Sequence, residues 1–334
     1  MNSIVNNVVH RQSSHCESGV VANMLNSQGF ELSEPMVFGL ASALMFVYLP
    51  MVKVGGLPLI AYRMPPKSII SSVCKKLDVK LTSQKFSNED EGMKALDQAL
   101  SEGKLVGLQT SVYWLPYFPE DMRFQFNAHN LTVYGKNEAG DYLISDPVFE
   151  DVVTCPPENL KQARFAKGML AAKGLMYVMD KPQVNADLEI QIRKSIKKTA
   201  KMMNGLVLPF FGIKGIYHLA KKIDKLKKSS EQEVGMFLSN IVRMQEEIGT
   251  GGAGFRFMYA SFLDEASQLL QDEKLHEISK FTTEVGDLWR EFAMKAVLFC
   301  KKRKNISLEE VSESLRVCAQ HETLLREKLL AWSK

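Results

Sequence analysis

The chain of 334 residues contains few cysteines, and their arrangement indicates neither disulfides nor a zinc site. The five cysteines are scattered: Cys16, Cys74, Cys155, Cys300 and Cys318. They form no Cys-x-x-Cys pair and no Cys/His cluster at zinc-ligand spacing. An odd number of isolated cysteines is typical of reduced thiols. We therefore expect no disulfide framework, no metal site and no cofactor.

Long apolar runs are also absent. No uninterrupted stretch reaches the roughly 18 residues that a membrane-spanning helix needs. The N-terminal sequence MNSIVNNVVHRQSS lacks the basic-then-apolar layout of a signal peptide. The composition, 46% hydrophobic and 24% charged, is close to that of soluble globular proteins. These features predict a cytoplasmic protein and argue against a membrane partner.

The pattern of periodicities divides the chain into two parts. Helical spacing of apolar residues predicts helices at about 16–28, 36–48, 67–78 and 90–102. Short runs bounded by turn residues predict strands at 79–86, 105–112, 131–135, 142–144 and 176–179. After Met179 comes the polar segment KPQVNA (181–186), followed by helical periodicity alone. We expect an α+β domain over 1–182 and a predominantly α-helical domain over 187–334.

The helical domain is expected to end in two long amphipathic helices, at about 281–302 and 307–332. Ser307 and Glu310 have the Ser-x-x-Glu spacing of a capping box, which predicts the start of the second of these helices.

Positive charge is concentrated in residues 190–228, although the net charge of the chain is only +4. This stretch holds eleven Lys/Arg and one acid, Asp224. Its basic edges, 193–201 and 221–228, flank an apolar middle at 202–217. The edges are interpreted as a solvated helix face or as a docking surface for an acidic protein. The middle is a candidate for contact with a membrane surface or an acyl chain. No nucleic-acid-binding motif is found, so nucleic acid is not an expected partner.

Cys16 lies in the first turn of the first predicted helix, which carries no basic residue. The unpaired N–H groups and the positive dipole end of a helix N-terminus stabilise a thiolate. The same N–H groups can stabilise an oxyanion on an attacked carbonyl. A buried cysteine that packs as a small hydrophobic residue is the alternative interpretation.

His129 and Asp146 belong to a predicted β-hairpin. His129 opens the first strand, the turn contains Asn137 and Gly140, and Asp146 follows the second strand. The hairpin therefore brings His129 and Asp146 to the same end of the sheet. There the carboxylate can hold one ring nitrogen of the imidazole while the other faces a thiol.

The chain order Cys, His, Asp-Pro resembles the papain-like cysteine enzymes, and the bacteriocin-processing peptidases in particular. The segments HCESGVVANMLNSQGFELSEPMVFGLASALMFVY (15–48) and IGTGGAGFRFMYASFLDEA (248–266) resemble the family of butirosin biosynthesis protein H more closely. The resemblance implies a papain-like catalytic domain followed by a helical domain that binds acceptor or carrier. It also implies transfer of an aminoacyl group from an acyl carrier protein thioester to an amine.

The resemblance assigns Cys16 as the acyl-accepting thiolate, His129 as its base and later acid, and Asp146 as the residue that orients His129. Papain-like enzymes place an oxyanion-binding glutamine a few residues before the cysteine. Gln12 lies four residues before Cys16, a shorter spacing than usual. The Cys16 backbone N–H is the preferred oxyanion donor, and Gln12 is the second candidate.

Residues 249–254 match the Gly-x-Gly-x-x-Gly template of dinucleotide-binding folds, but they follow a helical stretch rather than a strand. We therefore reject a nucleotide site. A tight turn between helices is one interpretation. In the other, suggested by the resemblance, Gly251 and Gly252 allow a substrate or pantetheine arm to approach the backbone, with Arg256 and Tyr259 as further binding residues.

The sequence thus predicts a cysteine-dependent acyltransferase. It moves an acyl or aminoacyl group from a carrier-protein or similar thioester, through acyl-Cys16, to a small-molecule amine in specialised-metabolite biosynthesis. The alternative is a papain-like cysteine peptidase or amidase, in which water replaces the amine. The identity of the acyl group and of the amine, and the choice between monomer and homo-oligomer, are left open.

Overall fold

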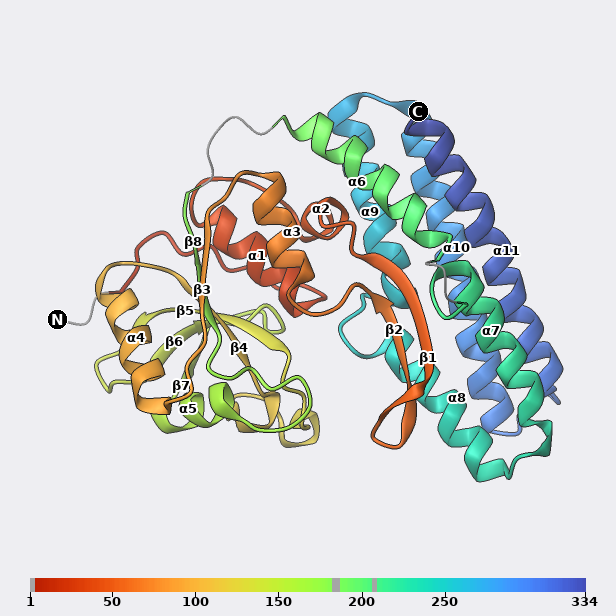
Figure 1. The fold of residues 1–334 in the computed structure, drawn as a ribbon, viewed down its shortest axis with the longest axis horizontal. Helices are drawn as coiled ribbons and strands as arrows, with labels where there is room; N and C mark the ends of the chain where they lie inside the picture. Colours follow the sequence, from red (N-terminus) through yellow and green to blue (C-terminus); the bar gives the residue numbers. More distant parts are fainter. Residues whose placement is uncertain (1–3, 182–186, 206–208) are drawn as a thin grey trace. The chain divides into compact units, whose positions relative to one another are not determined.

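A computed structural model describes residues 4–181, 187–205 and 209–334, and the chain divides into two compact units (Figure 1). The sheet unit comprises Met1–Val37 and Ile69–Ala186, and the helical unit comprises Phe38–Ser68 and Asp187–Lys334. The chain therefore enters the helical unit twice. This division differs from the predicted one because residues 38–68 belong to the helical unit. Residues 182–186 of the predicted linker lie outside the described residues.

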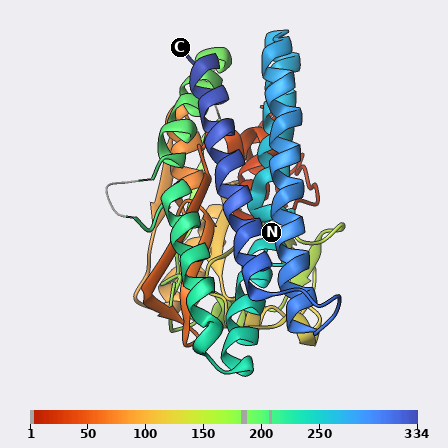
Figure 2. The same cartoon turned by 90° about the vertical axis from the view of Figure 1, so that its right-hand side faces the viewer.

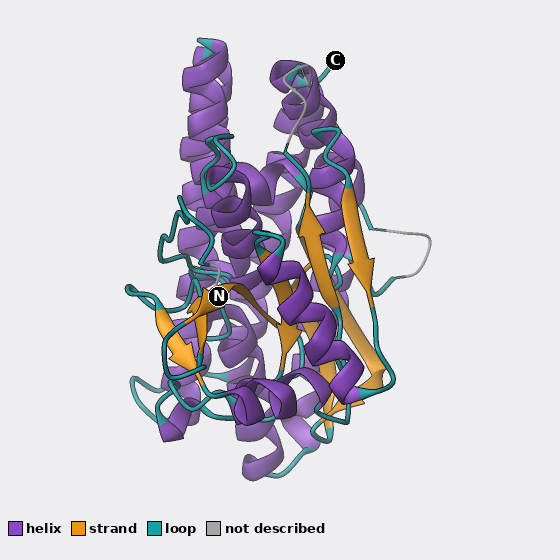
Figure 3. Ribbon diagram, turned by 90° about the vertical axis from the view of Figure 1, so that its left-hand side faces the viewer, coloured by secondary structure: helices purple, strands orange, loops and turns teal. Residues whose placement is uncertain are grey.

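The sheet unit is built on a six-stranded antiparallel sheet with strand order β3-β8-β4-β5-β6-β7 (Figure 3). Its strands are β3 Leu81–Gln84, β4 Val106–Thr110, β5 His129–Lys136, β6 Tyr142–Ser145, β7 Val153–Cys155 and β8 Met176–Met179. In the central strand β5, the first five residues are all buried. The strand reads HNLTV over these positions, so its polar side chains are buried together with its apolar ones.

Helices cover this sheet. They are α1 Cys16–Asn26, α3 Ser68–Lys76, α4 Glu89–Ser101 and α5 Pro157–Phe165, and the short α2 Glu34–Leu40 lies where the chain first leaves the unit. Short 3₁₀ turns occur at Val112–Trp114 and Glu120–Met122. Every residue of α1 after Cys16 is buried. A helix with so little exposed surface has no face for lysine or arginine, which explains the absence of basic residues from this segment.

The helical unit contains a β-hairpin and a group of long helices (Figure 2). Its elements are β1 Leu44–Val54, β2 Leu57–Arg63, α6 Leu188–Met203, α7 Gly212–Lys225, α8 Glu231–Glu246, α9 Arg256–Leu270, α10 Glu273–Cys300 and α11 Leu308–Trp332, with 3₁₀ turns at Leu226–Lys228 and Ala253–Phe255. Trp289 of α10 is fully buried, and Phe46 and Tyr62 from the hairpin pack against it at ring-centroid distances of 5.7 and 5.6 Å. These aromatic contacts anchor the hairpin to the helices.

The predicted helix at 36–48 is wrong in its second half. Helix α2 ends at Leu40, Ser42 adopts a positive φ of 55°, and strand β1 begins at Leu44. A short apolar run such as LMFVY fits a buried strand as well as a helix, so periodicity alone does not decide. Gly55 and Gly56, both with positive φ, form the turn between β1 and β2. Two such glycines between apolar runs are a hairpin signal.

The general class of a mixed α and β region followed by a helical one is confirmed, and the other predicted elements are confirmed within a few residues, except that the helix predicted at 281–302 begins eight residues earlier, at Glu273. The predicted capping box of Ser307 and Glu310 is confirmed, because both of its hydrogen bonds are present. The segment 249–254 follows helix α8, as expected, and not a strand. Strands β2 and β7 and helix α5 were not predicted; β7 has only three residues, and α5 has nine, most of them polar.

Candidate active site

Cys16 is the first residue of helix α1, and its side chain is half-buried. His15 caps the helix with an extended backbone, and its Nδ1 accepts the N–H of Ser18 at 3.3 Å. The thiol therefore lies in the first turn, where the helix dipole favours negative charge. The predicted position of Cys16 at a helix N-terminus is confirmed.

The half-buried carboxylate of Glu34 fixes the segment before the cysteine. Its two oxygens accept the N–H groups of Ser14 and His15 at 2.9 and 2.8 Å, and Oε1 also accepts the Ser18 hydroxyl at 3.0 Å. Burial raises the pKa of Glu34, while these hydrogen bonds oppose the rise. Three donors on one carboxylate hold the start of α1 in a single position.

Helix α1 approaches the Asp146-Pro147 segment closely at Gly19. A Cβ atom at Gly19 would lie 2.7 Å from the Cβ of Pro147 and 2.6 Å from that of Ser13. The N–H of Ser13 also donates to the carbonyl of Pro147 at 2.7 Å. Glycine at this position is therefore what allows helix α1 to lie against the segment that carries Asp146.

His129 and Asp146 form a buried pair at the end of the β5–β6 hairpin. His129 begins β5, and Asp146 follows directly after β6. The Nε2–H of His129 donates to Oδ2 of Asp146 at 2.7 Å, with both side chains less than 5% exposed. Because Nε2 is used in this way, Nδ1 is the ring nitrogen left for Cys16, whose side chain hydrogen-bonds to His129. The structure therefore brings all three predicted residues together.

The pKa of His129 is raised to about 10. Burial alone lowers it, but the charge of Asp146, the hydrogen bond to Asp146, and the hydrogen bond and charge of Cys16 together outweigh burial. The imidazole therefore holds its proton at neutral pH, beside a thiol at a helix N-terminus. A cysteine thiolate next to an imidazolium is the reactive form of the nucleophile in cysteine enzymes.

Two aromatic residues that sequence reasoning missed complete the surroundings of the pair. The hydroxyl of Tyr117 donates to Oδ2 of Asp146 at 2.8 Å. The ring of Phe118 packs edge-on against the imidazole of His129, with centroids 5.4 Å apart and planes at 90°. The segment VYWLPYF (112–118) is dense in aromatic residues and precedes His129 by little more than ten positions, which is the signal that could have indicated them.

Gln12 is exposed, and its side-chain amide donates to the carbonyl of Val148 at 3.1 Å. That carbonyl is two residues beyond Asp146, so Gln12 lies beside the loop that carries the carboxylate. One of its amide protons is used in this contact. The oxyanion role of Gln12 stays a prediction.

The predicted substrate residues of the glycine-rich segment lie in the helical unit. Gly251 and Gly252 adopt positive φ angles of 67° and 86° in the turn after α8. Arg256 and Tyr259 are buried, at 1% and 0% exposure. These positions fit a tight turn followed by a helix that packs in the core. The substrate-binding role of the four residues stays a prediction.

Arg256 forms a buried ion pair with Glu322. Its Nε donates to Oε1 of Glu322 at 2.7 Å, and its Nη1 donates to the carbonyl of Gly254 at 2.7 Å. The indole N–H of Trp289 donates to the same Oε1 at 2.9 Å. The adjacent cavity is large enough for about one water molecule. This geometry gives Arg256 a structural function in the helical unit.

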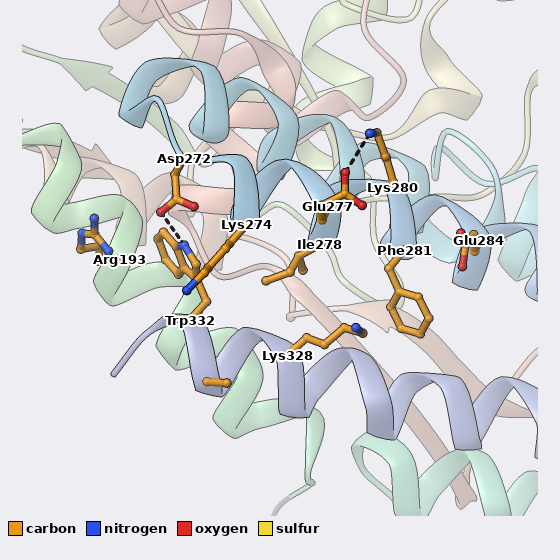
Figure 4. A pocket seen from close by; sticks show the side chains of 11 residues that line it. Arg193, Asp272, Lys274, Glu277, Ile278, Lys280, Phe281, Glu284, Lys328 and Trp332 are labelled. Carbon is orange, nitrogen blue, oxygen red and sulfur yellow. Dashed lines mark hydrogen bonds and ion pairs between the residues drawn. The ribbon is translucent and has the colours of Figure 1, made fainter.

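A wider, open groove lies in the helical unit between α6, α10 and α11 (Figure 4). Its aromatic residues already carry partners. The guanidinium of Arg193 lies 4.8 Å from the ring centroid of Trp332, and the indole N–H of Trp332 donates to Asp272 at 2.8 Å. Lys328 lies over Phe281 at 5.0 Å. The groove is lined by both cationic and anionic side chains, so its lining does not favour a ligand of one particular charge.

Within residues 4–181, 187–205 and 209–334, no group of three or more His, Cys, Asp or Glu side chains is arranged to hold a metal ion. None of the helices in these ranges is long and apolar enough to cross a membrane.

Comparison with protein families identifies the chain. Residues 15–147 match the family described as Butirosin biosynthesis protein H, N-terminal. Residues 158–329 match the family described as Domain of unknown function (DUF4872). The chain belongs to the butirosin biosynthesis protein H-like family. No curated protein matches it.

The first match begins one residue before Cys16 and ends one residue after Asp146. The butirosin biosynthesis protein H family thus covers the three residues that the structure brings together, and membership indicates a biosynthetic enzyme. The second match covers most of the helical unit, for which the family description gives no function.

Proposed function

We propose that the protein is a cysteine-dependent acyltransferase with a papain-like Cys16-His129-Asp146 triad. The observation that supports this most is the hydrogen-bonded chain from the thiol of Cys16 through the imidazole of His129 to the carboxylate of Asp146. The elements of such a chain are a nucleophile, its base and a group that orients the base. Family membership places the enzyme in biosynthesis, where group transfer is more useful than hydrolysis.

In the first step, the Cys16 thiolate attacks the carbonyl carbon of a thioester donor. The carbon–sulfur bond of the donor breaks, a new thioester forms at Cys16, and His129 gives its proton to the departing thiolate, which leaves as a thiol. The N–H groups at the start of α1 stabilise the developing oxyanion. Exchange between two thioesters is nearly isoenergetic, which suits a cysteine nucleophile.

In the second step, an amine attacks the acyl-Cys16 carbonyl. His129, now neutral, takes a proton from the amine, an amide forms as the carbon–sulfur bond at Cys16 breaks, and the Cys16 thiolate and the protonated His129 are regenerated. A transferase must keep water away from the acyl-enzyme until the amine arrives. The family resemblance, rather than any contact in the structure, is the basis for including acceptor binding by the helical domain in this proposal.

An acyl carrier protein is the proposed donor, and acidic carriers favour a basic docking surface. Helices α6 and α7 expose lysines along their lengths: Lys194, Lys197, Lys198, Lys201, Lys214, Lys221 and Lys225. These residues belong to the basic edges recognised in the sequence and to the start of α7. Residues 206–208 of the apolar middle lie outside the described residues.

The acyl group is expected to lie on the loop that carries Tyr117. This loop exposes Tyr113, Trp114 and Phe124, each at least 38% accessible. Thr110, the last residue of β4, pairs with His129, so the loop starts at the catalytic end of the sheet. Exposed aromatic side chains on a loop that begins near the nucleophile can bind the apolar part of a substrate.

Intact-protein mass spectrometry tests the proposal. The protein is incubated with acyl thioesters of carrier protein and of a small thiol, with Cys16→Ala as the control. The expected result is one acyl adduct on Cys16 that persists in buffer and discharges when a polyamine, an amino sugar or an amino acid is added. Rapid hydrolysis that no amine accelerates, or peptide cleavage at a comparable rate, would instead support the peptidase or amidase alternative.

A further inference from the structure

The carboxylate of Asp146 is held by three donors. Oδ2 accepts both the Nε2–H of His129 at 2.7 Å and the hydroxyl of Tyr117 at 2.8 Å. Oδ1 accepts the backbone N–H of Val148 at 3.1 Å. Of these donors, the backbone N–H and the phenol are the two that hold Asp146 independently of His129. The carboxylate cannot rotate toward or away from the imidazole without losing at least one of these bonds.

Tyr117 is itself held firmly in place. Its loop leaves β4 at Thr110 and is closed by a hydrogen bond from the N–H of Val112 to the carbonyl of Phe126 at 3.1 Å. The Tyr117 ring packs against Phe118 and Phe149, with centroids 5.3 and 5.4 Å away. A side chain with this many contacts retains one orientation, so its hydroxyl is a fixed donor.

The chemistry of the phenol restricts it to one role. Burial raises the pKa of Tyr117 well above its usual value of 10, and the charge of Asp146 and the hydrogen bond to Asp146 raise it further. The phenol therefore keeps its proton throughout the pH range in which the triad operates. It can donate to Asp146, but it cannot act as a base.

We propose that Tyr117 is a positioning residue of the active site. Its hydroxyl orients Asp146 and weakens the electrostatic attraction between Asp146 and the imidazole of His129. This inference rests on the proposed function, because it assumes that His129 is the base of Cys16. A hydrogen bond from the phenol spreads part of the negative charge of Oδ2. The negative charge of Asp146 that acts on His129 is therefore smaller.

We expect the pKa of His129 to shift in opposite directions in two variants. Tyr117→Phe leaves the full charge of Oδ2 facing the imidazole, so the pKa of His129 should rise by about half to one unit, which is less than the full free energy of one hydrogen bond to a charged group. Asp146→Asn removes the charge, so the pKa should fall toward or below 6.5. The other titratable groups near the pair are Cys16, which faces His129, and Cys155, which lies near Tyr117.

The experiment is an NMR titration of the His129 imidazole in full-length protein, with each substitution introduced into a Cys16→Ser background so that the thiol does not titrate. The matched control is Tyr142→Phe. It removes a tyrosine-to-carboxylate hydrogen bond of the same length, 2.8 Å to Asp97, from the same sheet. This control should leave the pKa of His129 unchanged. In the Cys16-containing protein, Tyr117→Phe should slow acyl loading about tenfold with little change in KM, less than the hundredfold that a 1 Å misplacement can cost.

An unchanged or lowered His129 pKa in Tyr117→Phe would overturn the inference. If that variant does not fold, Tyr117→3-fluorotyrosine keeps the shape and strengthens the donor, and it should lower the pKa of His129. No shift with the fluorinated residue would also overturn the inference. Failure of every acyl thioester to load wild-type Cys16 would refute the proposed function instead, and the titration would still report on Tyr117.

Discussion

Gly19 and Pro147 approach each other so closely that a Cβ atom on the glycine would lie 2.7 Å from the Cβ of the proline. This contact sets the separation between the helix that begins at Cys16 and the segment that carries Asp146. Real Cβ atoms do not come this near to one another, so a side chain at position 19 must move one of the two elements.

Gly19→Ala should therefore destabilise the protein by about 1–3 kcal/mol, as overpacking commonly does, and should reduce the reactivity of Cys16. Urea unfolding and the rate of iodoacetamide labelling measure the two effects. Gly235→Ala is the matched control, because nothing lies within 4 Å of a Cβ at that position of α8. Alanine in an open helical site should stabilise by up to about 1 kcal/mol. Equal behaviour of the two variants would mean that the Gly19 contact is unimportant.

Cys16 should be the first cysteine alkylated near neutral pH. Burial raises the pKa of Cys74 and of Cys155 to about 12, and it raises that of Cys318 further. Cys300 is exposed, but partial burial of its sulfur raises its pKa also. Peptide mapping after brief treatment with limiting iodoacetamide identifies the site. Loss of activity that follows a label on any other cysteine would contradict the assignment of Cys16.

Stability should fall with rising pH because of His129. The pKa of His129 in the folded protein is about 10, above its unfolded value near 6.5. The stabilising contribution of the protonated imidazole is therefore complete below about pH 6.5 and is lost as the pH rises through about 10. Melting temperatures of the wild type and of Asp146→Asn, compared between pH 6 and pH 10.5, check this. The variant should lose less stability over that range, and parallel curves would exclude a raised pKa in the wild type.

The buried ion pair of Arg256 and Glu322 allows a structural role of Arg256 to be distinguished from a role in substrate binding. Arg256→Ala leaves a carboxylate that is 2% exposed without its partner, so it should cost about 3–5 kcal/mol. Removing both charges with Arg256→Met and Glu322→Leu together should cost much less. Urea unfolding measures both variants.

A folded double variant also tests the predicted acceptor role. If it discharges acyl-Cys16 to amines as the wild type does, Arg256 is not an acceptor-binding residue. If it loads normally but discharges slowly, the prediction drawn from the glycine-rich segment is supported.

The sequence carried enough information to predict that Cys16, His129 and Asp146 lie together, but not which residues hold them in place. Cys16 follows a helix-start pattern, and the hairpin periodicity around His129 and Asp146 fixes which end of the sheet they share. These signals are local, because each depends on residues within about twenty positions. Tyr117 reaches Asp146 across 29 positions, and no periodic pattern indicates which aromatic side chain does so.

The error at residues 36–48 has a related cause. The apolar run that became β1 is compatible with a helix until its partner β2 and the covering residues Tyr62 and Trp289 are known. Likewise, the sequence makes Arg256 a candidate binding residue, and only the position of Glu322, 66 residues further along the chain, shows that its guanidinium has a buried ion-pair partner. In both cases the structure depends on contacts between residues that are far apart in the sequence.

Neither unit of the protein is a continuous piece of chain, and this affects its synthesis. Residues 38–68 leave the ribosome more than a hundred residues before the helices of 187–334 that share their unit. Until those helices are made, the apolar strand from Leu44 to Tyr48, fully buried in the finished protein, has nothing to cover it. Exposed strands of this kind are prone to aggregate in a nascent chain. A fragment that stops at residue 186 would retain the same strand without those helices, so a single cut does not separate Cys16, His129 and Asp146 from the part of the helical unit formed by residues 38–68.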